Sequence, residues 1–261
     1  MKYTNKLHSK NILILGGTSG IGFAVAEATL EHGAKITIAS SSASKLSAAI
    51  DRLKSAYPEF SQNIRGKTCD LSAADVEDQI TALYEYATDN GTNKLDHIAN
   101  TAGGPLHLTK LADVTSEIAA DFAKVRYIGN ILLAKHAANY MNKSPDSSFT
   151  TTSGVNSAKP AEGWSAIIGV ATAVEGLSRA LAKDLKPVRV NCVSPGAIKT
   201  ELFDTMGDEK VVQAIVDLYT GMTLTGRIGQ PEEAAESYLY VMKCGFVTGR
   251  TIHVDGGYLL V

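Results

Sequence analysis

Short apolar runs alternate with amphipathic stretches along the whole chain. Strand-like runs cover residues 12–15, 35–39, 64–69, 95–99 and 149–153, with two more near 188–194 and 252–257. Helical patterns cover residues 21–30, 45–56, 72–87, 115–140 and 164–185. Such alternation is typical of a doubly wound α/β fold. We therefore predict a single domain over residues 1–261, with a seven-stranded, mostly parallel sheet and helices on both faces.

A glycine-dense turn joins the first strand to the first helix. Gly16, Gly20 and Gly22 lie in this turn, directly after the apolar run 12–15. In a βαβ unit, such a turn and the helix N-terminus present backbone N–H groups to a pyrophosphate, and glycines allow its close approach. The alternative is a tight turn that needs glycine only for positive φ. The flanking strand and helix favour a dinucleotide site. The same turn would contribute Thr18, Ser19 and Ile21.

Composition and charge narrow the function classes. The chain has 261 residues, 44% of them hydrophobic, and a formal net charge of −2, which gives no electrostatic case for nucleic acid or an anionic membrane. No apolar run approaches the roughly 20 residues of a membrane span. Residues 1–10 form a polar extension without the apolar core of a signal peptide, so we expect a cytoplasmic protein. Cys69, Cys192 and Cys244 are expected to be free thiols, and the histidines show no metal-ligand spacing.

Several motifs resemble those of the short-chain dehydrogenase/reductase (SDR) family. The glycine turn is similar to the family's T-G-x-x-x-G-x-G, with Leu15 in place of Thr, and residues 100–103 resemble N-N-A-G. Further matches are R-V-N-x-V-x-P-G at 189–196, P-G-x-x-x-T at 195–200, G-R-x-G-x-P-E-E at 226–233 and V-D-G-G at 254–257. The resemblance spans nearly the whole chain and implies a Rossmann fold with a bound nicotinamide dinucleotide.

The end of the second strand bears on the choice of cofactor. An Asp or Glu there would bind the ribose 2′-hydroxyl and select NAD. This chain instead has Ser40, Ser41 and Ser42, followed by Lys45. Hydroxyls, exposed N–H groups and a lysine suit a 2′-phosphate, so we predict NADP(H). A serine-rich helix cap is the alternative, and one segment can serve both purposes.

The resemblance assigns the remaining cofactor contacts. Asp70 would accept a hydrogen bond from the adenine amino group, although Asp70 or Ser72 could simply cap the next helix. Asn100 would brace the fourth strand beside the cofactor ribose, and backbone at Ile198 would bind the carboxamide. The full set implied beyond the first turn and the serines is Asp70, Leu71, Asn100, Ala102, Gly103, Arg126, Pro195, Gly196, Ile198 and Thr200.

The residues that carry out proton transfer in the family are absent. Members use a Tyr-x-x-x-Lys helix motif, a Ser at the preceding strand end, and an Asn one helix earlier. Here the aligned positions hold Ile167 and Ala171, Gly154, and Arg126. No Tyr-x-x-x-Lys occurs anywhere in the chain. Similar losses are found in atypical fungal reductases of secondary metabolism.

Four residues are candidates for chemistry at this site. Arg126 would offer a permanent charge and bidentate hydrogen bonds to a substrate or cofactor, with a surface arginine as the alternative. Ser153 could hydrogen-bond a substrate. Glu162 could act as an acid with a raised pKa, or be a solvated residue near a helix start. Trp164 could form an aromatic wall for a ring-bearing substrate, or pack in the core. His136 is expected to pack.

The sequence therefore predicts an NADP(H)-dependent reductase that transfers hydride to a carbonyl or iminium carbon of a small secondary metabolite. An iminium needs no proton donor, which makes the loss of Tyr and Lys intelligible. Two alternatives stay open: a non-redox cyclase or isomerase on the same fold, and a catalytically inactive cofactor-binding protein. Residues 197–225 would form a substrate lid that includes Met206. The resemblance also implies a homo-oligomer.

Overall fold

The computed structural model describes residues 3–104, 109–205 and 207–261, so Met1, Lys2 and the lid residue Met206 lie outside the described residues. Within that part of the chain, seven parallel strands form one sheet in the order β3-β2-β1-β4-β5-β6-β7. The strands are β1 (Asn11–Leu15), β2 (Lys35–Ser40), β3 (Ile64–Thr68), β4 (His97–Asn100), β5 (Ser148–Thr152), β6 (Arg189–Pro195) and β7 (Thr251–Val254). The predicted doubly wound parallel fold is confirmed.

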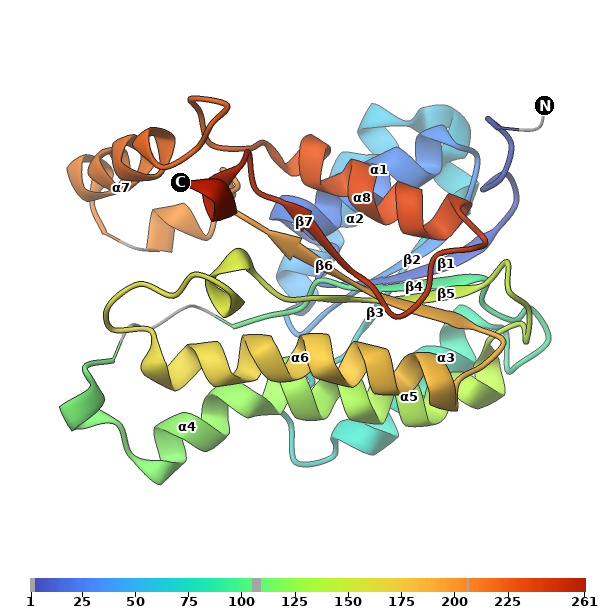
Figure 1. Cartoon of the computed structure of the whole chain (residues 1–261). Coiled ribbons are helices and arrows are strands. Elements are labelled where there is room, and N and C mark those ends of the chain that lie inside the picture. Colours follow the sequence, from blue (N-terminus) through green and yellow to red (C-terminus); the bar gives the residue numbers. More distant parts are fainter. Residues whose placement is uncertain (1–2, 105–108, 206) are drawn as a thin grey trace.

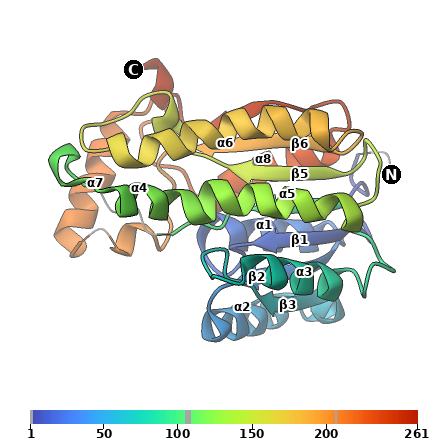
Figure 2. The same cartoon turned by 90° about the horizontal axis from the view of Figure 1, so that it is seen from below.

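Helices cover both faces of the sheet (Figure 1). One face carries α1 (Gly20–Glu31), α2 (Ala43–Ala56) and α8 (Pro231–Lys243). The other carries α3 (Val76–Ala87), α4 (Ser116–Ala123), α5 (Gly129–Tyr140) and α6 (Ser165–Asp184). The 13-residue helix α7 (Glu209–Gly221) lies apart from both layers, at the end of the sheet where α6 begins, in both views (Figures 1 and 2). Short helical turns are η1 (Pro58–Asn63), η2 (Leu111–Asp113), η4 (Val155–Ser157), η5 (Phe203–Thr205) and η6 (Tyr258–Leu260).

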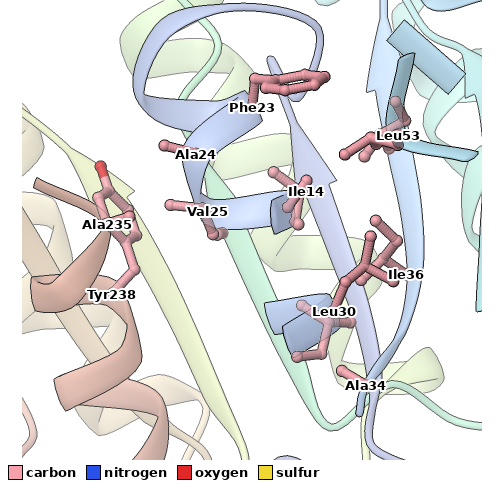
Figure 3. Close-up of a cluster of buried hydrophobic side chains, with 14 of the residues drawn as sticks. Ile14, Phe23, Ala24, Val25, Leu30, Ala34, Ile36, Leu53, Ala235 and Tyr238 are labelled. Atoms are coloured by element: carbon pink, nitrogen blue, oxygen red, sulfur yellow. The ribbon is translucent and has the colours of Figure 1, made fainter. Parts of the chain in front are cut away.

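Two apolar clusters hold these layers together. Figure 3 shows part of the first, where Val25 of α1 lies between the sheet residue Ile14 and Tyr238 of α8. The buried Leu7 belongs to the same cluster, so the polar N-terminal extension contributes one core residue. The second cluster joins α3, α5 and α6 to the opposite face of β1, β4 and β5. Burial on both faces explains why the central strands read as continuous apolar runs.

Two helix predictions were wrong in detail. The helix expected over 115–140 is divided into α4 and α5 by a π-helical turn, η3 (Lys124–Ile128), which contains Arg126. The helix expected over 72–87 begins only at Val76, because the Asp70 carboxylate accepts hydrogen bonds from the Ser72 backbone and hydroxyl and holds that stretch in a turn. π-helical turns often occur at functional sites.

Candidate active site

A single cavity of about 670 Å³ contains most of the predicted site. It lies at the carboxyl ends of the strands, where the strand order reverses between β1 and β4, the usual ligand position in such sheets. The predicted cofactor residues that line it are Gly16, Thr18, Ser19, Gly20, Ile21, Gly22, Ser40, Ser41, Ser42, Lys45, Asp70, Leu71, Ala102, Gly103, Arg126, Pro195, Gly196, Ile198 and Thr200. Asn100 is the one predicted cofactor residue outside the lining.

The glycine turn leaves no room for side chains. Gly16 and Gly20 adopt φ of +75° and +50°, a region that L-residues rarely occupy. A Cβ on Gly22 would lie 2.3 Å from the Gly16 carbonyl oxygen and from Thr101 Oγ1. The Thr101 hydroxyl in turn donates to the Leu15 carbonyl at 2.7 Å, which fixes the loop after β4 against the turn. The resulting concave backbone surface fits a dinucleotide pyrophosphate.

A carboxylate of the chain itself lies at this turn. The Gly20 N–H, at the N-terminus of α1, donates to Glu201 Oε2 at 2.8 Å. Helix N-termini attract anions because their backbone N–H groups lack partners within the helix. Glu201 therefore occupies a position suited to a phosphate oxygen. Sequence reasoning missed this residue, although its place directly after Thr200 was a usable signal.

The end of β2 combines the two roles expected of its serines. The Ser42 hydroxyl caps α2 by accepting from the Lys45 N–H at 3.3 Å, and the Ser42 N–H donates to Ser40 Oγ at 3.3 Å. Ser41 and the exposed Lys45 also line the cavity. The capping alternative is thus observed. A 2′-phosphate contact at the same residues stays a prediction.

Asn100 and Asp70 fix the strand ends on either side of β1. Asn100 is buried, donates to Asn130 Oδ1 at 2.9 Å and accepts from the Ala102 N–H at 3.1 Å. Its side chain shapes the loop below the cofactor position without lining the cavity. Asp70 lines the cavity, and one of its oxygens holds Ser72 in the turn before α3. The alternative that Asp70 or Ser72 caps the helix is wrong, because the N-cap residue of α3 is Asp75.

Arg126 is a half-buried cation with few partners among the described residues. The π-helical turn places its guanidinium against Gly103, where an added Cβ would lie 2.4 Å from the guanidinium carbon. One N–H donates to the Gly104 carbonyl at 2.8 Å. Among the described residues, no carboxylate forms an ion pair with it. Burial lowers the pKa of Arg126 from its ordinary value, yet a guanidinium keeps its charge in proteins. Its remaining donors suit an anionic or carbonyl ligand.

The four positions that differ from the family pattern lie around one cavity wall. Arg126, Gly154, Ile167 and Ala171 all line it. Ser153 lines it too, but its hydroxyl lies 3.0 Å from both the Ala171 carbonyl and Glu175 Oε1. Because a hydroxyl has one hydrogen, Ser153 is bonded to α6 before any substrate binds. The wall itself supplies no acid.

The two residues of the loop before α6 differ in position. Trp164 lines the cavity and is partly buried, as an aromatic wall requires. Glu162 is exposed and absent from the lining. The loop turns at Gly163, which has φ of +82°, so the two neighbouring side chains diverge. The structure therefore does not bring Glu162 to the site.

Three further polar residues line the cavity, and of these the sequence predicted only Tyr219, as a residue of the substrate lid. Asn156 in η4, Tyr219 in α7 and Tyr258 in η6 all line it. Tyr219 and Tyr258 have ring centroids 6.1 Å apart. No motif marks these residues, because they reach the cavity from three separate segments.

Other predicted features have structural roles. His136 contacts Glu77 at 3.1 Å on the surface between α5 and α3. Burial raises the pKa of the Cys69 and Cys192 thiols to about 11 and about 12, and all three cysteines are free. No cluster of three metal-ligating side chains occurs in the described ranges. Among the described residues, α6 is the one helix long and apolar enough to span a membrane by length and composition, a test that core helices of globular folds also pass.

Comparisons with known proteins extend over the full fold. Residues 3–261 match the family model described as an SDR-like Rossmann domain. The short-chain dehydrogenase/reductase ucsE of Acremonium sp is 43% identical over 258 residues, covering 98% of this chain and 97% of that protein. The corresponding malC of Malbranchea aurantiaca is 41% identical, covering 97% and 96%. The predicted resemblance to fungal reductases of this type is confirmed.

Solved structures give the same result. The MalC reductase/Diels-Alderase from Malbranchea aurantiaca superimposes with a TM-score of 0.93 at 40% identity, covering 99% of this chain and all of that one. A small-chain dehydrogenase in complex with NADPH superimposes with a TM-score of 0.76 at 27% identity, covering 97% and 100%.

Proposed function

Since the chain belongs to the short-chain dehydrogenase/reductase family, we propose that it is an NADP(H)-dependent reductase of a small, ring-bearing metabolite. The observation that carries this proposal is the cavity itself. It joins an intact glycine turn to a chamber in which Arg126 faces the apolar residues Ile167 and Ala171. An iminium carbon would need only the hydride. A carbonyl carbon would also need one proton on its oxygen, which solvent water would supply in place of the family's tyrosine.

The part of the cavity around the glycine turn, here called the cofactor half, would bind the dinucleotide in a defined orientation. Gly16, Gly20 and Gly22 would cradle the pyrophosphate, and the absence of a carboxylate among Ser40, Ser41 and Ser42 favours the phosphorylated dinucleotide. The backbone at Ile198 would hold the carboxamide. When bound, NADPH supplies the hydride. The small-chain dehydrogenase solved with NADPH is a family precedent for that cofactor.

The part of the cavity around Arg126 and Trp164, here called the substrate half, suits a hydride acceptor that the Arg126 charge activates. The Arg126 guanidinium has donors to spare and would stabilise the negative charge that develops on a carbonyl oxygen. A cationic iminium would instead be repelled by Arg126 but would need no proton. The two acceptor classes therefore make opposite demands on Arg126, and a variant without its charge separates them. Trp164 and Ile168 would exclude water from the reacting carbon.

A cyclisation without redox change is the second candidate function. It is favoured by the apolar wall at Ile167 and Ala171 and by the solved relative described as a reductase/Diels-Alderase. Such a reaction needs a shaped chamber and no proton donor. Under this alternative the cofactor would bind and shape the chamber but would not be consumed. A catalytically inactive cofactor-binding protein would show binding alone.

A titration followed by a turnover assay tests the proposal. We expect NADPH to bind the protein more tightly than NADH, measured by calorimetry. NADPH absorbance is then followed with a panel of cyclic ketones and cyclic imines. Consumption with any panel member supports the reductase. Binding without consumption favours the cyclase or the inactive protein, and no binding of either cofactor contradicts all three. A cytoplasmic location and a homo-oligomeric state stay predictions.

A further inference from the structure

The substrate half of the cavity contains a polar pair that the reductase proposal does not use. Asn156 lies in η4, two residues after Gly154, and Tyr219 lies near the end of α7. Both line the cavity. Figures 1 and 2 show α7 at the same end of the sheet as the start of α6, which is the end that holds Trp164. The pair thus combines a fixed loop after β5 with the predicted lid.

The hydrogen bonding of this pair is incomplete. The Asn156 side chain interacts with the Tyr219 phenol and opposes the rise of its pKa. Asn156 Oδ1 is buried and has no partner among the described residues. The amide N–H is therefore the group that can donate to the phenol oxygen. None of these residues accepts the hydroxyl hydrogen of Tyr219. A buried unsatisfied polar atom costs free energy, so natural folds seldom keep one without a reason.

The Tyr219 phenol is suited to donating a hydrogen bond. Burial raises its pKa above the ordinary value, the adjacent Tyr258 acts in the same direction, and the bond from Asn156 opposes both. The phenol therefore stays protonated at neutral pH. Because its oxygen is occupied by Asn156, its O–H is free to point to a ligand. The Tyr258 ring packs against the Tyr219 ring and restricts its movement.

We propose that the Tyr219 hydroxyl binds a carbonyl oxygen of the substrate, with Asn156 as the positioning residue that orients this hydroxyl. The inference rests on the cavity being the substrate site, and it holds for a reductase or a cyclase. It defines the ligand class as a ring compound with a neutral carbonyl acceptor. Tyr219 takes no part in proton transfer under this proposal.

The only tryptophan of the chain provides a local signal. Trp164 lines the same cavity, so quenching of its emission reports occupation of the chamber. Two probes share one carbon skeleton: 1-tetralone carries a carbonyl, and tetralin does not. Each is titrated into wild-type protein in the presence of NADP⁺, which cannot donate hydride. Cofactor affinity is measured separately by calorimetry, so a failure of the proposed function is distinguished from a failure of this inference.

Tyr219→Phe keeps the ring and removes the donor. We expect the dissociation constant of 1-tetralone to rise about fivefold to tenfold, as for the loss of one hydrogen bond, while the values for tetralin and NADP⁺ stay unchanged. Tyr240→Phe removes a hydroxyl from an exposed tyrosine outside the cavity lining and is the matched control, expected to change the binding of neither probe. Equal effects of Tyr219→Phe on both probes, no effect on 1-tetralone, or no binding of either probe to wild type would each overturn the proposal.

Asn156→Leu tests the positioning role. It should weaken 1-tetralone binding in the wild-type background and add nothing in the Tyr219→Phe background, because the two residues act through one hydroxyl. Urea unfolding of Asn156→Leu checks that the fold is intact, so that weaker binding reports the lost contact to Tyr219. Additive effects of the two substitutions would contradict the assignment of Asn156.

Discussion

Replacing Arg126 with methionine should raise stability and lower activity together. The Arg126 side chain is half-buried, donates one hydrogen bond of 2.8 Å to the Gly104 carbonyl, and lacks an ion pair among the described residues. Burying a cation costs several kcal/mol after relaxation, and a hydrogen bond to a charged group returns about 1.5–3 kcal/mol. Methionine keeps an apolar stem of similar length, so most packing is preserved.

The balance favours the variant by about 1 kcal/mol after allowing for the Gly104 carbonyl that is left unpaired. For a domain of this size, that difference raises Tm by roughly 2–4 °C. The measurement is urea and thermal unfolding of the cofactor-free protein. With a cyclic ketone as acceptor, we expect kcat to fall by about 10²–10³, as for the loss of one group that stabilises a developing oxyanion.

Glu162→Ala is the matched control, since Glu162 is exposed and lies outside the cavity lining. It should change neither stability nor turnover appreciably. If Arg126→Met lowers the free energy of unfolding by 2 kcal/mol or more, Arg126 supports the fold and the reasoning from its missing partners is wrong. Small and equal activity losses in the two variants would refute its catalytic assignment.

Two further predictions follow from single contacts. Glu201→Gln should tighten NADPH binding about fivefold in calorimetry. The Glu201 carboxylate accepts the Gly20 N–H and would repel a cofactor phosphate at about 4 Å. Unchanged or weaker binding would count against that position as the phosphate site. His97 is buried, and burial lowers its pKa from 6.5 to about 3. Between pH 6.5 and pH 3 the unfolded chain therefore binds a proton at His97 that the folded chain does not bind. The free energy of unfolding should therefore fall as pH drops below 6.5, by up to about 1.4 kcal/mol per pH unit. His97→Gln should reduce this pH dependence, measured by urea unfolding at pH 7 and pH 5. Parallel profiles for the two proteins would disprove the assignment to His97.

Local patterns predicted the cofactor half of the site because its residues are adjacent in sequence. The glycine turn, the serines after β2 and the P-G-x-x-x-T segment each form one strand end, and parallel strands bring their carboxyl ends together. The sheet and its order follow from the same alternation. The predicted ends of strands and helices were less accurate than their existence. The π-helical turn at Arg126, for example, does not change the 3.6-residue spacing of apolar positions from which the helix was predicted.

The substrate half could not be predicted in the same way. Tyr219, Asn156 and Tyr258 belong to three segments whose meeting depends on how α7 and the C-terminal turn pack. Glu162 and Trp164 looked equivalent in sequence, and only the positive φ of Gly163 between them separates their directions. Ser153 looked free, because its bond to Glu175 joins residues more than twenty positions apart.

Isotope transfer is the most direct test of the central claim that this cavity carries out hydride transfer without the family's tyrosine. The protein is supplied with NADPH deuterated at C4, in both stereochemical forms, together with the best acceptor of the ketone and imine panel, and the product is analysed by mass spectrometry. We predict one deuterium on the former carbonyl or imine carbon from one of the two forms, and none from the other. A product that forms without deuterium and without consumption of NADPH would contradict the reductase assignment and leave cyclisation as the function of the chamber.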